Sequence, residues 1–221
     1  MDFAALRLTL ELAALTTALL LCVSVPLAAW VAGSTRWYAR AVEAAIALPL
    51  VLPPTVLGFY LLVGLGPRTA AGRAIATLLG HSLAFSFAGL VVGSMLYSLP
   101  FAMQPLIVAF RAVPALQREA ASILGASPLQ VFRRITLPLA KQGFLAAAVL
   151  AFAHTVGEFG VVLMLGGDIP GSTRTLSIAI FDQVQEGNYA AANTMSLALL
   201  VLSFVALLAV YARRSRRSAH A

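Results

Sequence analysis

The sequence predicts an all-α membrane protein of five transmembrane helices, forming a single domain over residues 1–221. Hydrophobic residues make up 61% of the chain and charged residues only 10%, whereas soluble domains carry about 25% charged residues. The apolar residues also gather into long runs, and a membrane-crossing helix needs roughly 20 of them. Disorder is excluded because it requires low hydrophobicity. An ordinary soluble fold is excluded because the chain has too little polar surface to cover one.

Five apolar runs are long enough to cross a bilayer, and a polar loop separates the third from the fourth. We expect the spans at about 8–33, 42–66, 82–110, 143–166 and 190–212, with the loop at 111–141. Transmembrane strands would need alternating segments of about ten residues, which the sequence lacks. In the second run, Pro53-Pro54 should interrupt the helical hydrogen bonds, and in the third run Pro100 should kink the helix.

The basic residues predict the orientation of these spans. Eleven of the fifteen Lys and Arg residues follow the first, third or fifth run, and the other four lie on the opposite side. Basic loops stay in the cytoplasm, so the chain is expected to start outside and end inside. Asp2 and Glu11 argue against a cleaved secretory signal in the first run, because a signal begins with a basic region.

The loop at 111–141 predicts two short helices joined by a turn. Residues 119–124 favour a helix, and Gly125 stands where a left-handed cap is needed. Ser127 and Pro128 are a hydroxyl N-cap and a proline at the first helical position, so a second helix should start there and be limited by Pro138.

Leu129 and Phe132, three residues apart, should give the second helix an apolar face. That face could bind a partner protein, and a helix lying on lipid is the alternative.

The same loop resembles the coupling motif of ATP-binding-cassette (ABC) importer permeases. The motif reads Glu-Ala-Ala, three residues, Gly, nine residues, Ile-x-Leu-Pro, and its positions here are Glu119, Ala120, Ala121, Gly125, Ile135, Leu137 and Pro138. The resemblance implies a type I ABC importer permease fold. It also implies that the loop, with Leu129 and Phe132, docks into a groove on a separate ATPase subunit.

Three further stretches resemble molybdate permease subunits: 48–56, 157–160 and 169–175. The resemblance implies the channel-forming subunit of an ATP-driven molybdate importer in the bacterial inner membrane. A sulfate or tungstate permease is the alternative within this group. A secondary transporter is the alternative from another class, and it should show internal repeats, which we do not find.

Several partners follow from the resemblance. One coupling loop per chain implies a second copy of the chain around a twofold axis. Two cytoplasmic ABC ATPase subunits and a periplasmic oxyanion-binding protein complete the expected assembly, with the N-terminus periplasmic and the C-terminus cytoplasmic. The single lysine, Lys141, follows Ala140, so the chain has no phosphate-binding loop of its own. We therefore expect no enzyme activity, cofactor, metal or nucleic acid on this chain, with ATP and Mg bound by the ATPase.

Hydroxyl groups and helix breaks at membrane depth are candidates for the translocation path, because a tetrahedral dianion is bound by hydroxyls and amides rather than by carboxylates. The candidates are Pro53, Pro54, Thr55, Ser86, Ser94 and Ser98. For the hydroxyls the alternative is structural, since Ser and Thr in membrane helices often bond their own backbone. For Pro53-Pro54 a kink that helps gate the path is one interpretation, and simple packing is the alternative.

Five charged or titratable residues complete the candidate sites: an expected pair at membrane depth and three arginines in the outer segments. Glu158 is an acid deep in the fourth run, where acids are usually paired, and His154 four residues earlier is its expected partner. We favour a structural pair over substrate contact. Arg68, Arg73 and Arg174 lie against the orientation rule, so they are expected to form a docking surface for the binding protein or an anion funnel; solvated loops are the alternative.

Overall fold

The computed structural model describes the backbone of residues 1–218 and the side chains of residues 1–208, and every regular element in that part is a helix. The elements are, in chain order, α1 (Phe3–Gly33), α2 (Trp37–Ala47), η1 (Leu48–Leu50), α3 (Pro54–Leu65), α4 (Ala70–Leu79), α5 (Phe87–Arg111), α6 (Ala115–Ile123), α7 (Pro128–Val131), η2 (Phe132–Thr136), α8 (Leu137–Leu139), α9 (Lys141–Val156), α10 (Gly160–Gly166), α11 (Leu176–Gln185) and α12 (Tyr189–Ser218).

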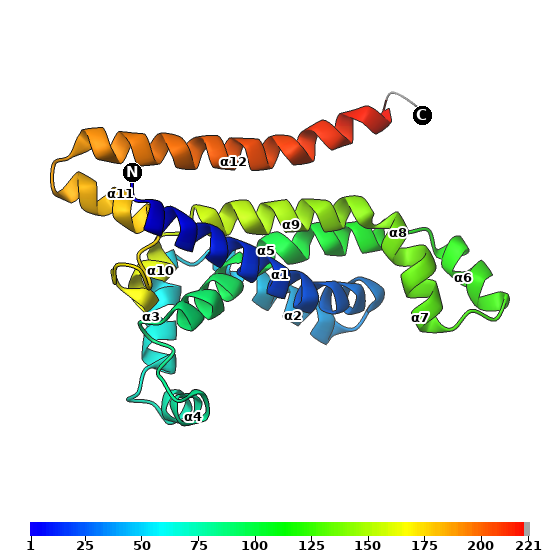
Figure 1. Cartoon of the computed structure of the whole chain (residues 1–221). Coiled ribbons are helices and arrows are strands. Elements are labelled where there is room, and N and C mark those ends of the chain that lie inside the picture. Colours follow the sequence, from blue (N-terminus) through cyan, green and yellow to red (C-terminus); the bar gives the residue numbers. More distant parts are fainter. Residues whose placement is uncertain (219–221) are drawn as a thin grey trace.

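Helices α1, α5 and α9 pack against one another along the length of the molecule and form its core (Figure 1). Small residues allow a close approach: Ala28 and Ala147 are fully buried, and a β-carbon on Gly143 would lie only 2.2 Å from Cβ of Ala109. Met103 and Leu106 fill the space that remains, and both are fully buried. Membrane helices gain little from burial against lipid, so packing of this kind holds them together.

Three helices are long and apolar enough to cross a membrane singly: α1, α5 and the Tyr189–Leu208 part of α12. They correspond to the first, third and fifth predicted spans with small shifts in their bounds. Helix α1 begins early because the Asp2 carboxylate accepts a hydrogen bond from the amide of Ala5. Helix α5 begins at Phe87 because the Ser86 hydroxyl accepts one from the amide of Gly89. It stays helical through Pro100.

The structure divides the second and fourth predicted spans: the break at Pro53-Pro54 in the second is the predicted one, whereas the break in the fourth is not predicted from the sequence. Within 42–66, the segments Trp37–Leu50 and Pro54–Leu65 meet at 109°, because Pro53-Pro54 cannot continue the helical hydrogen bonds. Within 143–166, α9 ends at Val156 and α10 starts only at Gly160. Helix α9 also meets Pro128–Leu139 at 70°. If each bent pair counts as one span, five spans result.

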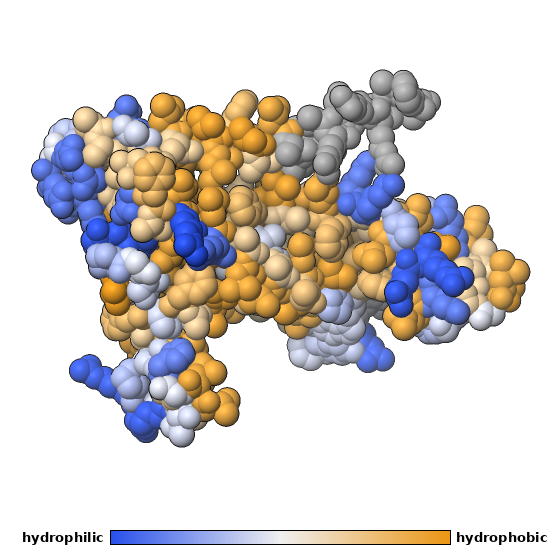
Figure 2. All heavy atoms as spheres, viewed as in Figure 1, coloured by the Kyte–Doolittle hydropathy of each residue, from blue (hydrophilic) through white to orange (hydrophobic). Residues whose placement is uncertain are grey.

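Two helices lie in segments that were expected as connections, α4 after the second span and α11 before the fifth. Both lie at the end of the bundle that also holds the N-terminus, whereas α6 and α7 project from the opposite end (Figure 1). Helix α12 packs on α11 and α9 and leaves a broad apolar side uncovered (Figure 2), with Leu197 57% and Phe204 61% exposed.

Candidate functional site

The turn between α6 and α7 has the geometry that the sequence predicts. Gly125 has φ of +86°, its amide bonds the carbonyl of Ser122, and the amide of Ala126 bonds that of Ala121. This pattern is a Schellman cap, which requires a left-handed residue at the glycine position. Beyond the turn, Ser127 and Gln130 cap α7 reciprocally, each side chain bonding the other's amide. The two helices are therefore held at a fixed angle.

The exposed apolar side chains of this loop lie mostly on α6 and the turn. Ile123 is 86% exposed, Leu124 87% and Leu129 63%. Phe132 does not share this face, contrary to the prediction, because it packs on Phe110 of α5 with ring centroids 5.9 Å apart. The chain widens into one π-helical turn at Phe132, and from there its apolar side meets the end of α5. The candidate docking face is therefore formed by Ile123, Leu124 and Leu129.

The remaining motif residues differ in their exposure to solvent. Glu119 and Ala120 are exposed on α6, whereas Ile135 and Leu137 are half-buried. Pro138 lies inside the last helical turn, and the helical run ends one residue later at Leu139.

The two helix breaks lie against each other. A β-carbon on Gly160 would lie 2.8 Å from Cβ of Pro54, and one on Gly58 would lie 2.7 Å from Cβ of Met164. Helices α3 and α10 therefore touch through glycines, and the stretches 48–56 and 157–160 form one structural unit. In this unit Pro53 and Thr55 are exposed. They are available to line a path formed with a neighbouring molecule.

The three serine candidates for the path have different surroundings. Ser86 is the N-cap of α5, because its hydroxyl accepts a hydrogen bond from the amide of Gly89, and the same hydroxyl donates to the carbonyl of Leu83. Ser94 and Ser98 are fully buried. The Ser98 hydroxyl lies 2.8 Å from Nδ1 of His154 and 2.9 Å from Oγ1 of Thr155. It thereby ties α5 to α9 inside the protein and does not line an open surface.

The expected ion pair between His154 and Glu158 is not formed in the described structure. Nδ1 of His154 bonds Ser98, and both carboxyl oxygens of Glu158 are buried without a hydrogen bond. The i, i+4 argument fails because α9 ends at Val156, so the two residues do not share a helix face. The hydroxyl of Ser94 is near the carboxyl of Glu158 but makes no hydrogen bond itself.

The aromatic surroundings of His154 were not predicted from the sequence. Its ring stacks on Phe101 with centroids 3.9 Å apart, and Tyr97 lies at 4.9 Å. Both aromatic residues and Ser98 belong to adjacent turns of α5. Their spacing around Ser98 is a helical one, and it could have suggested a shared packing face.

Arg174 is engaged within its own loop. Its guanidinium donates to both carboxylate oxygens of Asp168 at 2.5 and 2.8 Å and lies 3.6 Å from Asp182. The hydrogen bond from Arg174 lowers the pKa of Asp168. Burial, and then the neighbouring Asp168, raise the pKa of Asp182. With its charge paired in this way, Arg174 is a poor candidate for an anion funnel.

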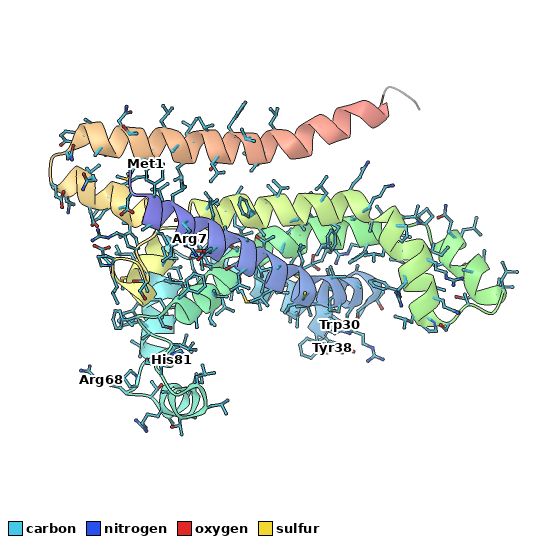
Figure 3. All side chains as sticks on the ribbon, viewed as in Figure 1. Met1, Arg7, Trp30, Tyr38, Arg68 and His81 are labelled. Carbon is cyan, nitrogen blue, oxygen red and sulfur yellow. The ribbon has the colours of Figure 1, made fainter. Side chains whose placement is uncertain are left out.

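Arg68 and Arg73 have different surroundings, beside and on α4. Both side chains are exposed, and Nη1 of Arg73 donates to the backbone carbonyl of Arg68. Figure 3 shows Arg68 and His81 in the segments that flank α4, away from the main helix bundle.

A family model described as the inner membrane component of binding-protein-dependent transport systems matches residues 24–217. The chain belongs to this family. It is therefore a multi-pass protein of the inner membrane, and the predicted membership of the binding-protein-dependent importer permeases is confirmed.

Relatives of this inner membrane component extend over nearly the whole chain. The molybdenum transport system permease protein ModB of Azotobacter vinelandii is 53% identical over 213 residues, which cover 96% of this chain and 94% of the relative. ModB of Haemophilus influenzae is 33% identical, with 94% and 91% covered.

Solved structures confirm the fold of a type I ABC importer permease. A bacterial transporter that imports the polysaccharide alginate matches with a TM-score of 0.75 at 19% identity, over 97% of this chain and 78% of that one. The MetNI methionine ABC transporter in inward-facing form matches with 0.71 at 21% identity, over 97% and 94%. At this identity the likeness concerns the fold alone.

Proposed function

We propose that the chain is the channel-forming subunit of an ATP-driven molybdate importer and moves the oxyanion from the periplasm to the cytoplasm. The observation that carries this proposal is the 53% identity to the molybdenum permease of Azotobacter vinelandii, over almost all of both chains. The stretches that resemble molybdate permeases also form one structural unit, in which Gly160 packs on Pro54.

The proposed energy source is a pair of separate ABC ATPase subunits that bind ATP and Mg. The exposed Ile123, Leu124 and Leu129 support this, because a water-exposed apolar group on a rigidly capped turn is suited to insert into a groove of a partner. Binding to the ATPases requires this end of the molecule to be cytoplasmic. The opposite end, with the N-terminus and α11, would then face the periplasm and the oxyanion-binding protein.

The proposed assembly contains two copies of this chain around a twofold axis. Each chain offers one coupling loop, so two copies are needed to engage two ATPases symmetrically. The segment that runs from η1 into α3 also leaves Val51 83% and Tyr60 67% exposed. A second copy facing this surface would enclose a path along the axis, lined by Pro53 and Thr55 of both chains.

Uptake by reconstituted vesicles tests the proposal. Vesicles containing the permease and its ATPase, with the binding protein added outside, should take up labelled molybdate only when ATP and Mg are present at the ATPase. Leu124→Asp should abolish uptake by placing a charge in the docking contact, whereas Gln117→Ala, an exposed change on the same helix, should leave it intact. If excess sulfate or tungstate were carried and molybdate were not, the assignment of the oxyanion would be wrong.

A further inference from the structure

Helix α4 stands apart from the bundle at a fixed angle to α3. The Thr69 hydroxyl caps it by accepting from the amide of Gly72 at 3.0 Å and donates to the carbonyl of Gly64 at 2.7 Å. A β-carbon on Gly72 would lie 2.0 Å from the carbonyl oxygen of Gly66, so the two segments touch backbone to backbone. Gly80 ends the helix with φ of +78°. The orientation of α4 is therefore built into the chain.

The side chains of α4 divide into an apolar face and a polar face. Apolar residues recur at i, i+3, i+4, i+7 and i+8, the pattern of an amphipathic helix, at positions Ala71, Ala74, Ile75, Leu78 and Leu79. Leu78 is 85% and Leu79 48% exposed. Arg73 and Thr77 lie on the opposite side of the helix. No other part of the described structure covers the apolar face to any large extent.

The position of this face relative to the spans indicates what covers it. Helix α4 lies across the direction of the spans, near the end of the bundle that holds α11 (Figure 1). In Figure 2, the hydrophobic atoms of α4 lie on its side toward the end of the molecule that holds α6 and α7. Its hydrophilic atoms lie on the opposite side. A water-soluble protein approaching from outside would meet the polar face. The apolar face points toward the depth that the hydrocarbon of a bilayer occupies.

The charges near α4 are of one sign. Residues 44–118 contain no Asp or Glu, so Arg68 and Arg73 have no acidic neighbour in sequence. Neither takes part in an ion pair within the described residues. Arg174 at the same end of the molecule is instead held by Asp168. The two arginines beside α4 are thus available to an anionic partner.

We propose that α4 lies in the headgroup region of the outer leaflet, with Leu78 and Leu79 among the acyl chains and Arg68 and Arg73 bound to the phosphates of anionic lipids. Amphipathic helices with basic polar faces bind membranes in this way. Ten residues would bind weakly alone, but α4 is tethered to α3, so its local concentration at the membrane is high. The helix then fixes the end of α3, and with it the helix break at Pro53-Pro54, relative to the bilayer.

Fluorescence quenching in vesicles tests this placement without ATPase, binding protein or transported ion. Because Cys22 is exposed, the starting variant is Cys22→Ser, and a fluorophore is attached through Leu78→Cys or, as the matched control on the other face, Thr77→Cys. In phosphatidylglycerol vesicles, the Leu78 probe should be quenched by lipids carrying a shallow nitroxide and shielded from iodide. The Thr77 probe should be quenched by iodide.

The contribution of the arginines is tested in the same vesicles. Each arginine near an anionic surface contributes about 1 kcal/mol, or about fivefold in the equilibrium between embedded and exposed helix. The double variant Arg68→Gln/Arg73→Gln should therefore raise iodide access to the Leu78 probe, as should replacement of phosphatidylglycerol by phosphatidylcholine. Arg40→Gln, an exposed arginine far from α4, should not.

Three outcomes would overturn the proposal. Equal iodide access at both probes would place α4 in water. Shielding of Leu78 from both iodide and nitroxide lipid would indicate coverage by a second copy of the chain. Shielding that appears only after the binding protein is added would return Arg68 and Arg73 to a docking surface. Since no step involves transport, failure of the proposed molybdate function would leave this test unaffected.

Discussion

At the scale of single residues, Ser98 shows how one hydroxyl connects two membrane helices. It bonds His154 and Thr155 of α9 from its position on α5. Thr155 also donates to the carbonyl of Ala151, so removing Ser98 leaves Nδ1 of His154 unsatisfied, at a cost of about 1–3 kcal/mol. We expect Ser98→Ala to lower the thermal unfolding midpoint of the permease in detergent. Ser24→Ala is the matched control, because Ser24 is equally buried and its hydroxyl makes no hydrogen bond. Equal effects of the two variants would contradict the assigned role of Ser98.

Asp168 and Asp182 differ in their response to pH although both neighbour Arg174. The lowered pKa of Asp168 means that its contribution to stability is present above the ordinary value of about 3.9 and is lost as pH falls through the lowered value. The raised pKa of Asp182 has the opposite sign, so its ionisation reduces stability as pH rises through that value.

At pH 7, therefore, Asp168→Asn should lower the unfolding midpoint, because it removes about 1 kcal/mol or less from the free energy of unfolding for a partly exposed pair. Asp182→Asn should leave the midpoint unchanged or raise it. Melting curves from pH 7 down to about pH 3 would check both expectations, and the difference between the variants should shrink at the acid end. The expectation is refuted if Asp182→Asn is the more destabilising change at pH 7.

At the scale of elements, the turn at Gly125 sets the angle between α6 and α7. A β-carbon in the left-handed region costs about 1 kcal/mol or more, and asparagine is the residue that tolerates this region best after glycine. Gly125→Val should therefore abolish stimulation of the ATPase in reconstituted vesicles while leaving the helix bundle folded. Gly125→Asn should retain much of it. Normal coupling in the valine variant would show that the turn geometry is not needed for docking.

The elements also show where sequence reasoning was sufficient and where it was not. Local chemistry predicted the caps at Gly125 and Ser127, because both depend on neighbours in sequence. The position of Phe132 could not be predicted, since it depends on the π-helical turn that begins there and on the end of α5, where Phe110 meets it. Helical spacing predicts a contact between His154 and Glu158. That contact is not formed, because α9 ends at Val156, between the two residues. Hydropathy predicted the spans and Pro53-Pro54 predicted the break in the second one, but neither gives the angle of 109° between its two halves.

At the scale of the whole molecule, the deep interior contains hydroxyls and two titratable groups but no cluster of cations. No Lys or Arg occurs at 74–110 or 142–173, so α5 and α9 each carry one only at an end, and α10 carries none. The buried polar groups there are already used in part, as Ser98 is by His154. A transported ion must also bind weakly enough to leave its path. These features together argue against a tight anion site at membrane depth.

Selectivity between molybdate and sulfate is therefore expected to reside mainly in the binding protein rather than in the permease. The measurement pairs this permease and its ATPase in vesicles with a sulfate-specific binding protein engineered to dock on the outer loops. Labelled sulfate should then cross, at a rate comparable to that of molybdate with the native binding protein. Stimulation of ATP hydrolysis by the engineered protein serves as the control for docking. If hydrolysis is stimulated and sulfate does not cross, the spans themselves select the anion, and the path along Pro53 and Thr55 must contain a site that discriminates between two tetrahedral dianions.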